Sequence, residues 1–154
     1  MLIFLDIDGV MVPAKSWEKP ELLNDGFPAF NLRAVSALQS IISDGVTVML
    51  TTSHKSSYSI DEWKNIFERR GIKVNKLKSL DSNVNNLTRK EEILNWFNVN
   101  TCDEDFIIID DDKSLNDLPK FLKDNLVLTN SMVGLTDQHL QEIKLILNRG
   151  LQKV

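Results

Sequence analysis

Cysteine and histidine are scarce in this chain of 154 residues, which contains only Cys102 and two histidines. One thiol excludes an internal disulfide, and so few Cys and His side chains exclude the usual four-ligand structural zinc site. Long apolar runs are also absent, since none approaches the ~18 continuous residues of a membrane span. No basic region precedes the apolar start MLIFL, as it would in a signal peptide. We therefore expect a cytoplasmic protein with no membrane partner.

Positive charge is in short supply overall, with 18 Lys and Arg against 22 Asp and Glu and a formal net charge of -4. This balance argues against a protein that coats nucleic acid through bulk charge, although a local basic patch remains compatible with it. Residues 69–90 contain such a local excess, formed by Arg69, Arg70, Lys73, Lys76, Lys78, Arg89 and Lys90 against the single Asp81. This stretch either tracks a phosphate backbone or is a solvated face of the protein.

Short apolar segments alternate with segments of helical spacing along the chain. Strands are predicted at residues 2–5, 46–50, 106–109 and 126–128, with a weaker one at 72–77. Helices are predicted at 31–42, after the capping boxes Ser59/Glu62 and Thr88/Glu91, and from Thr136 onward. This alternation predicts an α/β fold, a Rossmann-like three-layer sandwich with a central parallel sheet of about five strands.

The length fits one domain over residues 1–154, with room for a proper core. Residues 10–30 contain three prolines and Trp17, and we expect them to form an irregular flap over the site. Trp17 either packs within this flap or stacks on a substrate. Trp63, Trp96 and Phe97 fall at helical spacing and are interpreted as core residues.

Polar residues follow three of the predicted strands. Asp6 and Asp8 come after the first, Thr51 and Thr52 after the second, and residues 110–112, all aspartates, after the fourth. Because ligand sites in parallel α/β sheets lie at the carboxyl ends of the strands, one site explains the three clusters together. Asp6 and Asp8 project from the same face of an extended segment, and a hard cation that prefers oxygen ligands, most simply Mg²⁺, would offset their repulsion.

Four motifs in a fixed order resemble the haloacid dehalogenase (HAD) superfamily of phosphohydrolases. They are DIDGV with Asp6 and Asp8, VMLTTS with Thr51, TRKEEILNWF with Lys90, and IIIDDD with Asp110 and Asp111. No segment is long enough for a folded cap module, so the resemblance implies a capless HAD-like domain with an open site.

The resemblance implies a role for each matched residue. Asp6 would be the nucleophile that forms an aspartyl-phosphate, and Asp8 the general acid and base. Thr51 would donate a hydrogen bond to the phosphoryl group, and Lys90 would bind it at a helix amino end. The Mg²⁺ ligands would be Asp6, the Asp8 backbone carbonyl, and one or both of Asp110 and Asp111.

Several assignments within these motifs stay open. Thr52, Arg89 and Gly9 are alternative phosphate-binding residues, and Asp112 is an alternative metal ligand. One of the three consecutive aspartates is expected to cap the following helix. His54 is interpreted as a polar loop residue rather than a catalyst.

Two finer resemblances point to a substrate class. KEEI with a following Trp resembles the phosphatase domain of phage polynucleotide kinase, and TTSHK and NSMVGLTDQHL resemble the HAD domains of RNA-repair proteins. The predicted function is therefore a magnesium-dependent phosphatase whose substrate is accessible or macromolecular. The alternatives are a polynucleotide 3′-end phosphatase and a non-catalytic HAD-fold binding module. The oligomeric state stays open.

Overall fold

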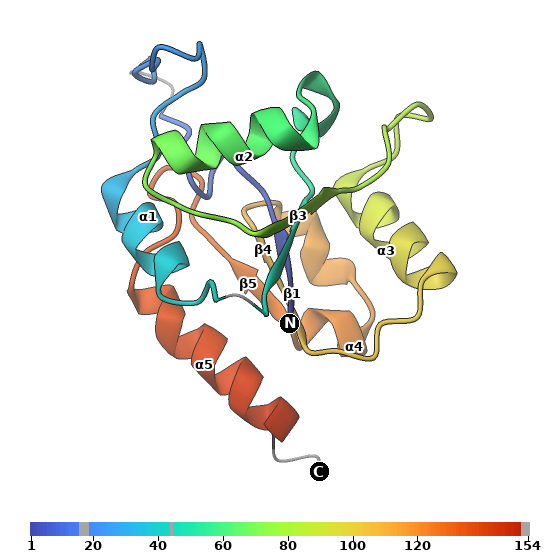
Figure 1. Ribbon diagram of the computed structural model, residues 1–154. Helices are drawn as coiled ribbons and strands as arrows, with labels where there is room; N and C mark the ends of the chain where they lie inside the picture. The colour runs from blue at the N-terminus through green and yellow to red at the C-terminus, as the bar shows by residue number, and fades with distance from the viewer. Residues whose placement is uncertain (16–18, 44, 152–154) are drawn as a thin grey trace.

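Five parallel strands form the central sheet in the computed structural model, which describes residues 1–15, 19–43 and 45–151 (Figure 1). They are β1 (Leu2–Leu5), β2 (Thr47–Leu50), β3 (Lys76–Ser79), β4 (Phe106–Asp110) and β5 (Leu126–Leu128). Their order across the sheet is β3-β2-β1-β4-β5. The chain moves outward on one side of β1, then crosses after β3 to the other side, so β1 and β4 flank the point where the order reverses.

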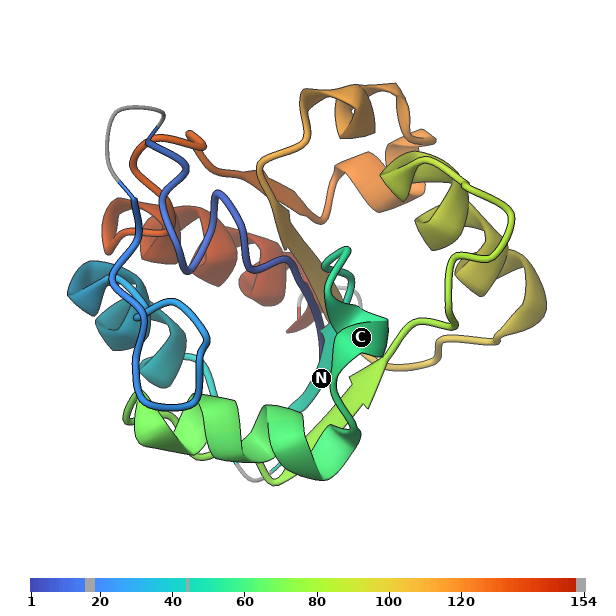
Figure 2. The same cartoon turned by 90° about the horizontal axis from the view of Figure 1, so that it is seen from above.

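Helices cover both faces of this sheet, as the view from above shows (Figure 2). Buried side chains of α1 (Leu32–Gln39), α2 (Ile60–Arg69) and α5 (Gln138–Leu151) pack on one face. Those of α3 (Arg89–Val99) and α4 (Lys120–Lys123) pack on the other, together with the 3₁₀ turn η2 (Lys113–Asp117). A second 3₁₀ turn, η1 (Lys55–Ser57), follows β2. The predicted α/β three-layer sandwich with five parallel strands is confirmed.

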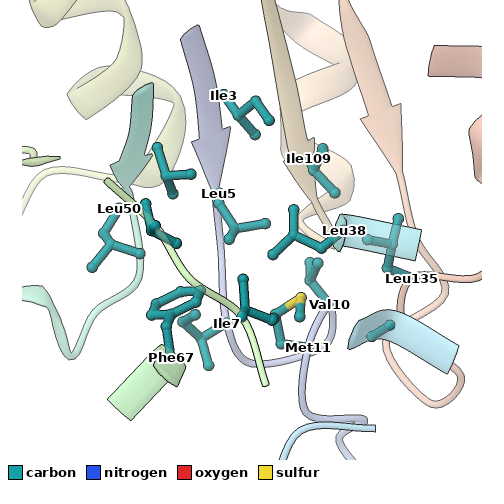
Figure 3. Close-up of a cluster of buried hydrophobic side chains, with 14 of the residues drawn as sticks. Ile3, Leu5, Ile7, Val10, Met11, Leu38, Leu50, Phe67, Ile109 and Leu135 are labelled. Atoms are coloured by element: carbon teal, nitrogen blue, oxygen red, sulfur yellow. The ribbon is translucent and has the colours of Figure 1, made fainter. Parts of the chain in front are cut away.

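Side chains alternate between the two faces of the sheet along β1, and this alternation determines the face on which the side chain of Asp6 lies. Ile3 and Leu5 point to the core shared with α1, α2 and α5 (Figure 3). Leu2 and Phe4 point to the core under α3 and α4. Each fully buried side chain of this size contributes about 1.5–3 kcal/mol, so the register is strongly specified. Asp6 comes two residues after Phe4, and continued alternation places it on the α3 side of the sheet.

Both predicted capping boxes are present, at Ser59 with Glu62 before α2 and at Thr88 with Glu91 before α3. The third strand, however, was misplaced by the prediction at 72–77, because pairing with β2 begins only at Lys76 opposite Thr47. The apolar residues before it are buried without being in a strand, and an apolar run alone does not distinguish the two cases. Two helices are shorter than predicted: α1 ends at Gln39, and α5 begins two residues after Thr136.

The described part of residues 10–30 has no helix or strand, and it is fixed to α2 through Arg70. The guanidinium donates to the Asp25 carboxylate at 2.7 and 3.0 Å and to the carbonyls of Phe27, Pro28 and Ile66 at 2.7–2.9 Å. All five N–H donors of this arginine are thereby used. Trp17 lies outside the described residues, so its predicted role is untested.

Among the residues that the structure describes, no helix is both long enough and apolar enough to cross a bilayer.

Candidate active site

Three polar residues lie side by side at the carboxyl edge of the sheet. Leu5 of β1 pairs with Leu50 of β2 and Ile109 of β4, so one residue further along Asp6 lies between Thr51 and Asp110. Backbone bonds continue the ladder here, from Thr51 N–H to the Leu5 carbonyl at 3.0 Å and from Asp6 N–H to the Ile109 carbonyl at 3.1 Å. All three side chains are buried.

Asp111 joins Asp6 and Asp110 in an acidic cluster. One carboxylate oxygen from each lies within 4.8 Å of the others. Asp111 comes this close because residue 9 is a glycine: a Cβ there would lie 2.0 Å from the Asp111 Oδ2, and the backbone has a φ of +82°. Three carboxylates at this spacing are a donor set that suits Mg²⁺, so the predicted metal ligands Asp6, Asp110 and Asp111 are brought together.

Arg89, the first residue of α3, faces this cluster. Its Nη1 lies 2.6 Å from Asp110 Oδ2 and 3.4 Å from Asp6 Oδ1, and its side chain is 15% exposed. Its Nε lies 4.0 Å from Glu92, which in turn pairs with the buried Lys55 at 2.7 Å. Positive and negative groups therefore alternate from Lys55 to the acidic cluster.

The sequence interpretation missed Lys55 and Glu92. The available signals were the position of Lys55 directly after the hydroxyl run TTSH and the i,i+3 spacing of Glu92 from Arg89. Neither signal indicates that the side chains of Lys55 and Glu92 are buried. Their burial places this ion pair next to Arg89.

The electrostatics of the cluster favour additional positive charge. Burial, and then the Asp110 charge, raise the pKa of Asp6 to about 8, although Arg89 opposes this shift. Burial also raises the pKa of Asp110 above its ordinary value. A carboxylate must be ionised to act as a nucleophile, and a divalent cation among these oxygens would favour the ionised form.

Two buried polar atoms beside the cluster have no hydrogen-bond partner within the described chain: the Thr51 hydroxyl and Arg89 Nε. Buried donors normally find partners, so both fit a bound anion such as a phosphoryl group. Thr52, the alternative to Thr51, already accepts a 3.4 Å bond from the His54 N–H. The unpartnered hydroxyl therefore favours Thr51 over Thr52.

Asp8 extends from the cluster toward solvent and contacts His54. The His54 Nε2 lies 2.8 Å from Asp8 Oδ2, and both side chains are about half exposed. His54 packs its ring against Phe27, with centroids 6.0 Å apart. The residue that the sequence suggested as an ordinary loop residue thus holds the side chain of the predicted acid and base.

A cavity of about 330 Å³ contains the site and is lined by Asp6, Asp8, Ser53, Arg89, Asp110, Asp111 and Asp112. Ser53 is an addition to the predicted set. Lys90 is not in the lining, and within the described residues it makes no hydrogen bond or ion pair, so Arg89 and not Lys90 faces the acidic cluster. Asp112 accepts bonds from the Ser114 backbone and hydroxyl, which is the capping role expected of one of the three aspartates.

Two further expectations differ from the structure. The Gly9 N–H donates to the Val12 carbonyl at 2.8 Å, so this donor is already used and does not support the suggested phosphate contact. The described part of residues 10–30 contributes no residue to the cavity lining, so it borders the site through Phe27 and His54 instead of covering it.

The segment after β5 braces the loop that carries Asp8. The Thr129 hydroxyl donates a buried 2.7 Å bond to the Gly9 carbonyl. The Leu135 N–H donates to the Val10 carbonyl at 2.8 Å, and the adjacent Gly134 has a φ of +81° and would meet that carbonyl if it carried a Cβ. The backbone just after Asp8 is therefore fixed by two hydrogen bonds from the segment after β5.

With this geometry in place, comparison with known families gives a match over most of the chain. The model of the HAD domain in Swiss Army Knife RNA repair proteins covers residues 2–140. The chain belongs to this family. The predicted HAD membership of RNA-repair type is confirmed, and it points to a phosphohydrolase domain. Searches among curated proteins and among solved structures returned no match.

Proposed function

We propose that this HAD domain is a magnesium-dependent phosphohydrolase that acts through an aspartyl-phosphate on Asp6. The observation that carries the proposal is the buried cluster of Asp6, Asp110 and Asp111 facing Arg89, with the unpartnered Thr51 hydroxyl beside it. This arrangement combines a nucleophile, oxygen ligands for a cation, and donors for a phosphoryl group.

In the first step, an Asp6 carboxylate oxygen forms a bond to phosphorus while the bond to the leaving oxygen breaks, and the Asp8 carboxyl protonates that oxygen. In the second step, water attacks the phosphorus, Asp8 takes its proton, and inorganic phosphate leaves with Asp6 regenerated. Mg²⁺ held by the carboxylates of Asp6, Asp110 and Asp111 would neutralise the phosphoryl oxygens as charge develops.

The remaining residues position these groups. Arg89 and the Thr51 hydroxyl donate to the phosphoryl oxygens, which satisfies their two unpartnered atoms. His54 orients the half-exposed Asp8 carboxyl through its 2.8 Å contact with Oδ2. Glu92, which pairs with Lys55, places a negative charge 4.0 Å from Arg89 Nε.

A polynucleotide 3′-end phosphatase is the more specific candidate, and two observations favour it. The family consists of HAD domains that occur in RNA repair proteins. The cavity is also bordered by solvent and has no cap lining among the described residues, which suits the end of a chain better than an engulfed metabolite.

The test is phosphate release from an aryl phosphate, mononucleotides, sugar phosphates and a 3′-phosphorylated oligonucleotide, with and without Mg²⁺. We expect release to require Mg²⁺ and to be lost in Asp6→Asn, while Asp61→Asn, an exposed aspartate in the first turn of α2, retains it. Preference for the oligonucleotide would support end repair. No release above that of Asp6→Asn from any substrate would refute the enzyme and favour the binding module.

A further inference from the structure

A second and larger cavity lies beside the catalytic one, between the 80–87 loop and α3. Its volume is about 470 Å³, and Asn83, Asn85, Asn95, Asn98 and Asn100 line it. The two cavities meet at the first turn of α3, because Glu92 lines the larger cavity while its carboxylate faces Arg89. The Ser56 and Ser82 hydroxyls, 3.0 Å apart, also join the loop after β2 to the 80–87 loop.

The lining of this cavity disfavours anionic ligands. Its ionisable side chains are the two carboxylates of Asp81 and Glu92, and the described lining contains no lysine or arginine. A phosphate or another anion would be repelled there. The group that binds there is therefore not an anion, and it can use both donors and acceptors because each asparagine amide offers both.

The amides fall into two groups. Asn83 closes the loop on itself through two 2.7 Å bonds to the Leu87 backbone, and Asn100 donates to the Trp96 carbonyl at 2.9 Å, so the roles of both are structural. The amides of Asn85, Asn95 and Asn98 make no hydrogen bond to another group in the described chain. They remain available to a ligand, and paired amide contacts to the edge of a base are a common form of base recognition.

Apolar surface completes the cavity. Val84 on the loop and Val99 on α3 are both 81% exposed, and Trp96 is half-buried in the wall between them. Glu92, Asn95, Trp96 and Val99 follow the i, i+3, i+4, i+7 spacing, so they form one stripe along α3. A flat ring with polar edges matches this mixture of apolar walls and amides.

We propose that this cavity binds a nucleobase of the RNA strand whose phosphorylated end occupies the catalytic site. The inference rests on the proposed function. From Arg89 to Asn95 the helix rises about 9 Å, at ~1.5 Å per residue. That span equals two to three nucleotides at about 3.4 Å of rise each, so the base belongs to a nucleotide near the end.

Exposed lysines lie where the strand's phosphates would pass. Lys76 and Lys78 are exposed on edge strand β3 and alternate with the buried Leu77, so they share the sheet face of Leu80, a residue of the cavity wall. Arg70 and Arg89, by contrast, are used inside the protein. Within residues 69–90, the side chains available to contact the phosphates of the RNA strand are therefore mainly lysines.

The test compares Asn95→Ala/Asn98→Ala with Asn148→Ala, a matched exposed asparagine on α5. Alanine is tolerated at exposed helix positions, so folding should be retained. For a 3′-phosphorylated single-stranded RNA we expect the double variant to lose about tenfold or more in kcat/KM, mainly through KM. Hydrolysis of an aryl phosphate, which is too small to reach the cavity, should be unchanged.

Binding of the same RNA to Asp6→Asn, followed by fluorescence anisotropy, tests the cavity independently of turnover. Removing the bases near the 3′ end should weaken binding to Asp6→Asn but not to Asp6→Asn carrying the two alanines. Equal RNA affinity and kinetics with and without the alanines would overturn the nucleobase site even if the phosphatase is active. If no substrate is hydrolysed, the phosphatase fails while the anisotropy result still decides the nucleobase site.

Discussion

Arg89 and Lys90 are neighbours in the sequence, and their substitutions should have very different consequences. Arg89→Ala removes a guanidinium that lies 2.6 Å from Asp110 and 3.4 Å from Asp6 and is only 15% exposed. Loss of one donor to the transferring group typically costs about 10²–10³ in kcat, or roughly 3–4 kcal/mol. Lys90→Ala removes a charge outside the cavity lining, for which about 0–1 kcal/mol is expected.

The assay is the initial rate of phosphate release measured across a Mg²⁺ titration for the wild type, both alanine variants and Arg89→Lys. Arg89→Lys keeps the charge but loses the planar fork, so its rate should lie between those of the wild type and Arg89→Ala. Arg89→Ala should also reach saturation at lower Mg²⁺, because the carboxylate cluster loses its neighbouring cation.

Stability has to be measured alongside activity. Without Mg²⁺, Arg89→Ala leaves buried carboxylates without their partner, a change that typically costs about 3–5 kcal/mol. Thermal unfolding with and without Mg²⁺ identifies the conditions in which the variant is folded. If Lys90→Ala reduces kcat of the folded protein more than Arg89→Ala does, the assignment of the phosphate-binding cation is wrong.

Three further predictions concern the groups that support the site. Gly9→Ala should weaken Mg²⁺ binding by about 10–100-fold, measured by activity titration, because the new Cβ displaces Asp111. Arg70→Met should lower the free energy of unfolding in urea by about 3–5 kcal/mol, whereas the exposed Arg69→Met should stay within about 0.5 kcal/mol. The hydrogen bonds from Arg70 hold the pKa of Asp25 at about 2, below 3.8, so the stability they provide is present above pH 3.8 and is lost as the pH falls toward 2. We expect the free energy of unfolding, measured as a function of pH, to fall by about 1–2 kcal/mol over this range in the wild type. The decrease should be absent in Arg70→Met.

The strand ends were predictable from the sequence because a buried strand must stop where charged residues begin. An apolar run followed directly by Asp6, or by Asp110, marks the carboxyl edge of the sheet without knowledge of the tertiary structure. The parallel order then brings these ends together. The grouping of Asp6, Asp110 and Asp111 followed from this reasoning, and the capping boxes placed the starts of α2 and α3.

Helix rotation was not predictable in the same way. Successive residues of a helix point about 100° apart, so only one of Arg89 and Lys90 faces the cluster. The choice depends on the rotation of α3 about its own axis when Ile93 packs into the core. No pattern in the sequence specifies this rotation. The contact between His54 and Asp8 was missed for a related reason, because a loop has no periodicity from which to infer its neighbours.

The bond from Thr129 to Gly9 has a consequence for how the protein is made. It joins residues 120 positions apart, so the loop that carries Asp8 is completed only after β5 and the residues up to Thr129 have been synthesised. Asp6 and Asp8 therefore spend most of translation in a loop without its brace. A chain interrupted before Thr129 would carry Asp6, Asp8, Asp110 and Asp111 but would lack this bond, so we expect the loop that carries Asp8 to be less ordered in such a chain.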